Sequence, residues 1–175
     1  MRYVGIDPST RTGFVVLDKQ ENVVRAKELT GVGSKDPKRM VTLIDEVIAH
    51  VRSDDVICIE NFGFASRQAI QMGGIGWGIR MALFRRGWQY IDVAPGQLKK
   101  FASGKGNTKK DELAVHIYKR WGFEHSSDNV RDAFVLARIG WSIYNDDGVT
   151  YTATKAEREV IDAVLNPKEK KKVSR

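Results

Sequence analysis

Short apolar runs separated by polar turns dominate the first third of the chain. Residues 2–7, 13–18 and 22–29 have the composition of strands, and the connections between them are short enough for an antiparallel meander. Residues 56–60 form a continuous apolar run, which is typical of a strand buried on both faces. A fifth strand is predicted over residues 88–93. The pattern therefore predicts a mixed sheet in which 56–60 lies parallel to the first strand.

Helical spacing of apolar residues appears between these strands and dominates after them. Residues 37–52 repeat apolar side chains at helical spacing, and residues 66–86 are predicted helical despite four glycines. Farther along, the capping-box pattern that begins at Thr108 predicts a helix start. Another helix is expected to be capped by Ser126 or Ser127. Strands followed by helices in this order predict an α/β domain.

The length of 175 residues, 42% of them hydrophobic, suits one domain with a substantial core. We expect this domain to span residues 1–165, with a last helix over 153–165 and a flexible basic tail over 166–175. No run approaches the roughly 18 to 20 apolar residues of a membrane span, and the start of the chain lacks a signal-peptide profile. The single cysteine, Cys58, excludes a disulfide framework. A cytoplasmic protein is therefore expected.

The positive charge is concentrated in two segments. The chain has a net charge of +7, yet residues 99–120 contain seven Lys or Arg against two acids, and the tail over 166–175 contains five against one. Clustered cations gain affinity for nucleic acids by releasing phosphate counterions. Charge alone leaves two readings open, a polyanionic partner or a solvated surface with a frayed tail.

Two carboxylates stand where predicted strands end. Asp7 closes the first strand and Glu60 closes the strand at 56–60. Parallel neighbours lie about 4.8 Å apart, so both carboxylates are expected to meet at one edge of the sheet. Like charges that close repel unless a proton or a cation intervenes, and carboxylate oxygens are the ligands that Mg²⁺ prefers. A turn role is the alternative for either acid considered alone.

A third acid is expected from the helix that follows Ser127. Asp128 and Asp132 share a face of this helix because they are four residues apart, and Asn129 and Asp132 do so because they are three apart. Asp132 lies beside the apolar stripe and is expected to face the sheet. Asp128, in the first turn, has the alternative role of stabilising the helix dipole. We expect the carboxylates of residues 7, 60 and 132 to lie within reach of a shared ion.

Four motifs in order resemble the RuvC-type Holliday-junction resolvases of the RNase H-like superfamily. They are GIDPSTRTG, ICIENF, VAPGQLKKFASGKGNTKKDEL and DNVRDAFVLA, and the similarity covers roughly residues 2–145. The resemblance implies a five-stranded mixed sheet flanked by helices and a homodimer. It also implies Mg²⁺-dependent cutting of four-way DNA junctions, with Mn²⁺ as a substitute, inside a bacterial or phage-infected cell.

The resemblance also implies roles for individual residues. Two Mg²⁺ ions would be held by the acidic set, and paired symmetric nicks would leave 5′-phosphate and 3′-hydroxyl ends. The metal ligands would be Asp7, Glu60 and Asp132, completed by Asp128 or Asn129. Lys110 would stabilise charge on the reacting phosphate. The contacts to DNA would come from Lys99, Lys100, Lys105, Lys109, Lys110 and the aromatic residue Phe64.

The chain departs from the family pattern in three places. The earlier of the last two ligands falls on Asn129, so Asp128 is the alternative for its role. The first turn is shorter than in the common bacterial members. The aromatic residue that contacts junction bases is expected at Gly63, which Phe62 and Phe64 flank; Phe62 is favoured as a core residue. These departures favour a divergent member, with a bacteriophage origin as a hypothesis.

Two other functions share part of this pattern. Asp-x-Ser-Thr after a first strand also occurs in actin-like ATPases, which need a second related domain that 175 residues leave no room for. A non-catalytic junction-binding module would need the basic segments but not the three acids together. The glycines at 73, 74, 76 and 78 do not follow a strand, which argues against a dinucleotide fingerprint and favours close helix packing.

Overall fold

Five strands form one sheet in the order β3-β2-β1-β4-β5. The structure is a computed structural model that describes residues 1–62, 69–148 and 151–167. The strands are β1 (Tyr3–Asp7), β2 (Thr12–Leu17), β3 (Val23–Leu29), β4 (Val56–Glu60) and β5 (Ile91–Val93). The first three pair antiparallel, whereas β4 lies parallel to β1 and to β5. The predicted mixed sheet with its meander is confirmed, although β5 is shorter than expected.

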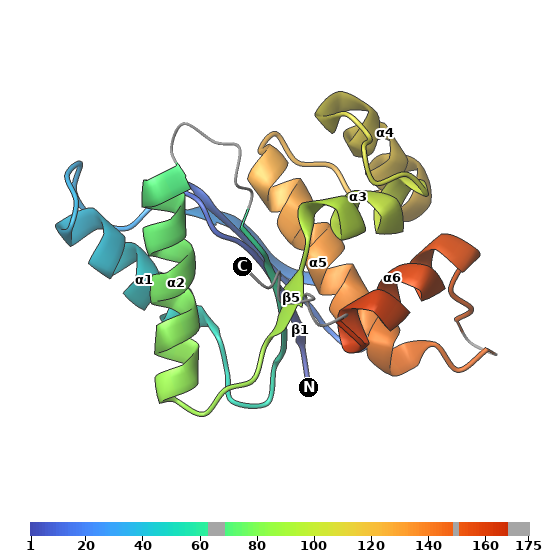
Figure 1. Cartoon of the computed structure of the whole chain (residues 1–175), viewed down its shortest axis with the longest axis horizontal. Helices are drawn as coiled ribbons and strands as arrows, with labels where there is room; N and C mark the ends of the chain where they lie inside the picture. Colours follow the sequence, from blue (N-terminus) through green and yellow to red (C-terminus); the bar gives the residue numbers. More distant parts are fainter. Residues whose placement is uncertain (63–68, 149–150, 168–175) are drawn as a thin grey trace, which may run out of the picture.

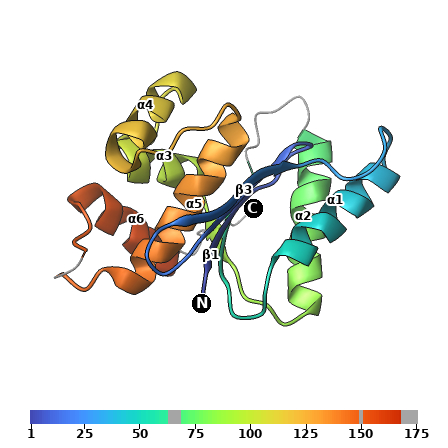
Figure 2. The same ribbon diagram turned by 180° about the vertical axis from the view of Figure 1, so that it is seen from behind.

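Helices cover both faces of this sheet (Figure 1). One face packs against α1 (Lys38–His50) and α2 (Ala69–Arg85), and the other against α3 (Pro95–Ser103), α4 (Lys110–Trp121), α5 (Asp128–Asn145) and α6 (Lys155–Leu165). Figure 2 shows the same layers from behind, with β3 at the near edge of the sheet. In the described part of the chain, none of these helices has the length and hydropathy needed to cross a membrane.

Successive side chains along β1 and β4 point to opposite faces of the sheet, and this alternation decides on which face Asp7 and Glu60 lie. Val4 and Ile6 enter the core beneath α1 and α2, while Tyr3 enters the core beneath α5. Asp7 has the same parity as Tyr3, and therefore points to the α5 face. The same counting from Cys58, which lies in the α5 core, puts Glu60 on that face.

Helix α5 lies unusually close to the sheet because glycine faces it. A Cβ added to Gly5 would lie 1.8 Å from the carbonyl oxygen of Ala133, and one added to Gly13 would lie 1.9 Å from the carbonyl oxygen of Asn129. No side chain fits at either position. The two glycines thus let the first half of α5, which carries Asp132, pack directly on β1 and β2.

Two details of the helical half differ from the sequence predictions, and one stays untested. Helix α3 was not predicted. It begins at Pro95, which the sequence analysis interpreted as the end of a strand, although proline is also favourable in the first turn of a helix. The capping box at Thr108 was wrong: the N-cap of α4 is Lys109, and the Thr108 hydroxyl bonds to Ser103 and to the carbonyl of Lys105 instead. The boundary between domain and tail stays a prediction, with residues 168–175 outside the described chain.

Candidate functional site

Asp7 and Glu60 lie next to each other at the ends of β1 and β4. Each follows the last registered pair, Ile6 with Ile59, by one residue, and the two carboxyl groups are close enough to influence each other's pKa. Burial, and then the charge of Glu60, raises the pKa of Asp7 well above its usual value. Burial also raises the pKa of Glu60, with a further contribution from Asp132. Glu60 therefore disfavours the ionised form of Asp7, as expected of like charges at a shared buried position.

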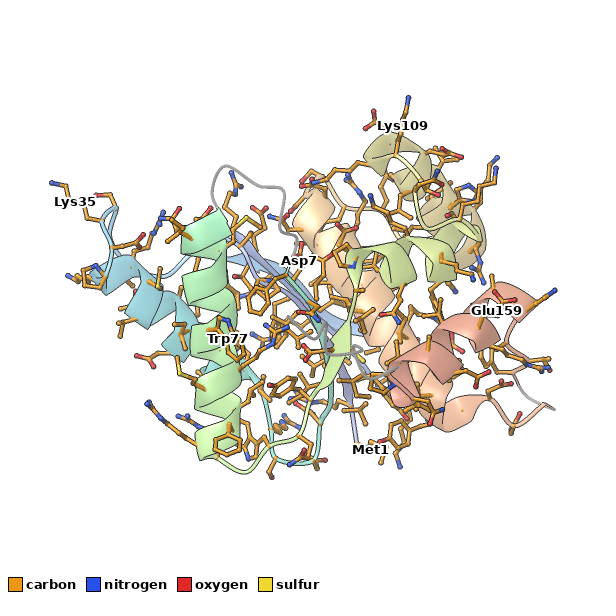
Figure 3. All side chains as sticks on the ribbon, in the orientation of Figure 1. Met1, Asp7, Lys35, Trp77, Lys109 and Glu159 are labelled. Atoms are coloured by element: carbon orange, nitrogen blue, oxygen red, sulfur yellow. The ribbon has the colours of Figure 1, made fainter. Side chains whose placement is uncertain are left out.

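Asp132 faces the same pair from the second turn of α5. Its pKa is raised to about 7, first by burial and then by the charge of Asp7. Figure 3 places Asp7 at the end of the sheet, between the helices of the two faces. The charge of Asp132 therefore acts on Glu60, and that of Asp7 acts on Asp132. Each of the three acids is destabilised as an anion by the others or by burial.

Lys110 and Asp128 form an ion pair at the edge of this acidic cluster. Lys110 opens α4, Asp128 opens α5, and the ammonium group donates to the Asp128 carboxylate. This hydrogen bond lowers the pKa of Asp128. The charge of Lys110 also favours the ionised forms of Asp7, Glu60 and Asp132. Lys110 is therefore the nearest positive charge that the chain supplies to the cluster among the described residues.

Asn129 is engaged with the turn between β1 and β2. Its Nδ2 donates to the Ser9 hydroxyl over 3.1 Å and to the Arg11 carbonyl over 2.8 Å. These bonds tie the start of α5 to the segment that follows Asp7. Sequence reasoning treated Asn129 only as a metal ligand and missed this anchoring contact, which joins residues about 120 positions apart.

Glu28 on β3 is a second residue that the sequence analysis missed. The Ser127 hydroxyl, which also caps α5, donates to Glu28 over 2.5 Å, and Arg11 pairs with the same carboxylate. The hydrogen bond from Ser127 and the bond from Arg11 lower the pKa of Glu28. Neither periodicity nor spacing signals this contact. Glu28 fixes the α5 start relative to the β1–β2 turn.

The predicted DNA-contacting lysines fall into different surroundings. The charge of Lys99 reaches Glu60, where it favours the carboxylate form. Lys100 pairs with Glu159 of α6 at 2.5 Å, so it is held on the α6 side of α3. Lys105 and Lys109 are exposed in the segment that joins α3 to α4. Figure 3 labels Lys109 there. The basic segment therefore borders the acidic cluster at Lys99 and Lys110 and extends into solvent beyond it.

The aromatic candidate Phe64, together with Gly63, lies outside the described residues. Phe62 is half-buried and stacks on Trp77 of α2 with ring centroids 5.4 Å apart. Because Trp77 is itself 56% exposed, this contact does not decide whether Phe62 covers the core.

The donor set suits a hard divalent cation by type and charge. Asp7, Glu60 and Asp132 offer carboxylate oxygens, and their raised pKa values mean that a cation would replace protons there. Within residues 1–62, 69–148 and 151–167, no three His, Cys, Asp or Glu side chains are gathered closely enough to hold an ion. The acids repel one another and Asp128 turns to Lys110. The expectation that the carboxylates of residues 7, 60 and 132 lie within reach of one shared ion is therefore wrong for the described residues as they stand, although the donor types suit a metal.

The sheet order β3-β2-β1-β4-β5 and the helices on both faces are those of an RNase H-like fold. No protein-family model matches the chain. Among curated proteins, it is 27% identical over 160 residues to the crossover junction endodeoxyribonuclease RuvC of Synechococcus sp. strain CC9311, covering 81% of this chain and 98% of that protein. It is 25% identical to the RuvC of Campylobacter hominis, covering 78% and 93%.

Solved structures show the same relationship. The RuvC structure of Thermus thermophilus superposes with a TM-score of 0.61 at 18% identity, covering 81% of this chain and 94% of that one. The T. thermophilus RuvC in complex with a Holliday junction substrate superposes with a TM-score of 0.60, covering 78% and 90%. The resemblance to RuvC-type resolvases is therefore confirmed in sequence and in fold.

Proposed function

We propose that this protein is a crossover junction endodeoxyribonuclease that resolves four-way DNA junctions with a divalent metal. The observation that carries the proposal is that Asp7 and Glu60 end neighbouring parallel strands of the sheet, and that Asp132 of α5 is close enough for its charge to act on them. Buried acids that destabilise one another cost folding energy, and such sites are typical of function. The two RuvC proteins named above align with this chain over 98% and 93% of their length.

In this proposal each acid acts as a ligand, and the fold supplies their arrangement. Asp7, Glu60 and Asp132 would hold the metal, and Asp128 or Asn129 would complete the set. Two Mg²⁺ ions, with Mn²⁺ as a substitute, would supply a water nucleophile and neutralise the leaving 3′ oxygen, giving 5′-phosphate and 3′-hydroxyl ends. The ion pair of Lys110 with Asp128 keeps a cation at the site, where it favours an anionic phosphate.

The DNA would be held by the basic segment that borders the acids. Lys99 and Lys110 face the acidic cluster, whereas Lys105 and Lys109 extend from the α3–α4 connection. Contacts of this kind position the phosphate backbone and do not read sequence. The basic tail over 166–175 and Phe64 are further candidates for DNA contact. Branched DNA is thus the proposed substrate, and selectivity would arise from shape.

A homodimer is proposed because a four-way junction presents pairs of equivalent strands. Helix α2 leaves an apolar stripe in solvent that consists of Ile70, Trp77, Met81 and Phe84, of which Ile70 is 94% and Phe84 81% exposed. The spacing of seven, four and three residues is that of one side of a helix packing on a second helix. A stripe of this kind suits a second copy of the same helix, related by a twofold axis. Trp77 is labelled on α2 in Figure 3.

Phe84→Asp is expected to convert a dimer into a monomer, because a charge buried in an apolar contact loses its hydration. Light scattering coupled to size-exclusion chromatography measures the mass directly. Val115→Asp is the matched control, since Val115 is a half-exposed apolar residue on α4, away from the stripe. It should leave the mass unchanged. A dimeric Phe84→Asp variant would contradict the interface.

The function is tested with a synthetic four-way junction, Mg²⁺ and end-labelled strands. Symmetric nicks in opposite strands are expected, with ligatable ends, and junction binding should weaken by orders of magnitude between about 50 and 200 mM salt if six or more phosphates are contacted. Binding without nicking in Mg²⁺ or Mn²⁺ would favour the architectural module. ATP turnover in place of nicking would favour the ATPase-type alternative.

A further inference from the structure

Arg80 of α2 is a buried arginine that binds the backbone of Glu60. Its side chain is 3% exposed, and its Nη2 donates to the Glu60 carbonyl over 3.0 Å. The same guanidinium donates to the Gly76 carbonyl over 3.1 Å and forms an ion pair with Asp92 of β5 at 2.6 Å. Arg80 therefore joins three elements, α2, β4 and β5, at the residue that ends β4.

The glycine at position 76 makes room for this arrangement. A Cβ at Gly76 would lie 2.7 Å from the Phe62 ring and 3.3 Å from Nη1 of Arg80. The guanidinium carbon lies 4.7 Å from the centre of the Phe62 ring and 5.7 Å from that of Tyr90. One of the four α2 glycines thus serves the packing of a cation against the segment that follows Glu60.

We propose that Arg80 is a positioning residue that sets the direction of the Glu60 carboxylate by holding its carbonyl. The inference rests on the proposed function, in which Glu60 is a metal ligand. The last β4 residue is also held by the Asn61 amide, which donates to the Val93 carbonyl over 2.8 Å. That bond fixes the strand end from the β5 side, while Arg80 fixes it from the α2 side. Catalytic geometry is sensitive to displacements of about 1 Å, so loss of one anchor has a measurable effect.

The chain offers a matched control for loss of a buried guanidinium. Arg138 of α5 is also 3% exposed, forms an ion pair with Glu21 and lies 4.8 Å from the centre of the Trp141 ring. Its contacts reach the β2–β3 turn and not the end of β4. Arg80→Lys and Arg138→Lys each replace an equally buried guanidinium with an ammonium group, with Arg80 losing hydrogen bonds to three residues and Arg138 its bond to Glu21. Only the first change acts on Glu60.

The test compares the two variants with the unsubstituted protein in two measurements. Hydrogen–deuterium exchange of the metal-free proteins follows a peptide that covers residues 58–62. Steady-state nicking of the junction is measured below the unfolding midpoint of every variant. Arg80→Lys should raise exchange in that peptide and lower kcat by about tenfold, with KM for the junction within about twofold. Asp92→Asn, which weakens the anchor and retains Arg80, should act in the same direction by a smaller factor.

Arg138→Lys should change neither the exchange of residues 58–62 nor kcat. Equal exchange in the Arg80→Lys and Arg138→Lys proteins would overturn the proposal, as would an equal fall in kcat or a fall explained by KM alone. A protein that nicks no junction even without substitution contradicts the proposed function. The exchange measurement then still decides whether Arg80 holds the end of β4, because it needs neither metal nor DNA.

Discussion

Asp7→Asn is expected to abolish junction cleavage while junction binding is preserved or becomes tighter. Asparagine has the same shape but carries no charge, so it cannot replace a carboxylate that balances a divalent cation. We expect a fall of at least about 100-fold in the rate of nicking. Folding should not suffer, because the charged form of Asp7 is disfavoured by burial and by Glu60. Nicking assays and binding titrations on one preparation separate the two effects.

Asp55→Asn is the control for loss of a buried carboxylate. The Asp55 side chain is fully buried and pairs with Arg2 at 2.6 Å, next to the start of β4 and thus at the opposite end of the sheet. This variant should lose about 3 kcal/mol of stability, as expected for a broken buried pair, and should cut the junction when folded. An Asp7→Asn protein that cuts at the normal rate would show that Asp7 holds no essential metal.

Gly5→Ala is expected to destabilise the protein strongly and to remove activity from the fraction that still folds. The added Cβ would meet the Ala133 carbonyl oxygen at 1.8 Å and the Ala137 amide nitrogen at 2.6 Å. Both are backbone atoms of α5, which cannot rotate away, so the helix must shift as a body. We expect a cost of more than about 3 kcal/mol. Urea unfolding measures it, and nicking is normalised to the folded fraction.

Gly140→Ala tests whether close contact alone produces this effect. Gly140 also belongs to α5 and faces the sheet, but a Cβ there would lie 3.2 Å from the Cys58 sulfur and 3.4 Å from Val56. These side chains can give way, and alanine favours the helix, so the change should stay within about 1 kcal/mol. Equal stability of Gly5→Ala and Gly140→Ala would refute the view that glycine is required beneath Ala133.

The acidic cluster illustrates how far the sequence analysis reached. Strand ends are visible in a chain because the change from apolar to polar residues is local, and the period of two assigns each side chain to a face. Asp7 and Glu60 were therefore expected side by side, and the parallel register of β1 and β4 places them next to each other. Asp132 was expected to face the sheet from its place beside an apolar stripe, and its raised pKa agrees with that position. Their roles as metal ligands stay predictions.

The failures also have local causes. Helix α3 was missed because its first residue, Pro95, ends a strand as readily as it begins a helix. The prediction of a capping box at Thr108 was wrong because the Thr108 hydroxyl forms hydrogen bonds with the Ser103 hydroxyl and the Lys105 carbonyl. Both errors arose where the same local sequence is compatible with two local structures, a strand end or a helix start at Pro95 and a helix cap or a loop contact at Thr108.

The sequence by itself determined the strand order of the meander, the faces of β1 and β4 and the residues available as metal ligands, since these follow from local composition and period. Only the tertiary structure decided which residues hold the ligands in place. The bond of Ser127 to Glu28, that of Asn129 to Ser9 and that of Arg80 to Glu60 each join separate elements. Such contacts depend on how the helices pack on the sheet. The hydrophobic periodicity of a sequence carries no information on which polar side chains of separate elements come into contact.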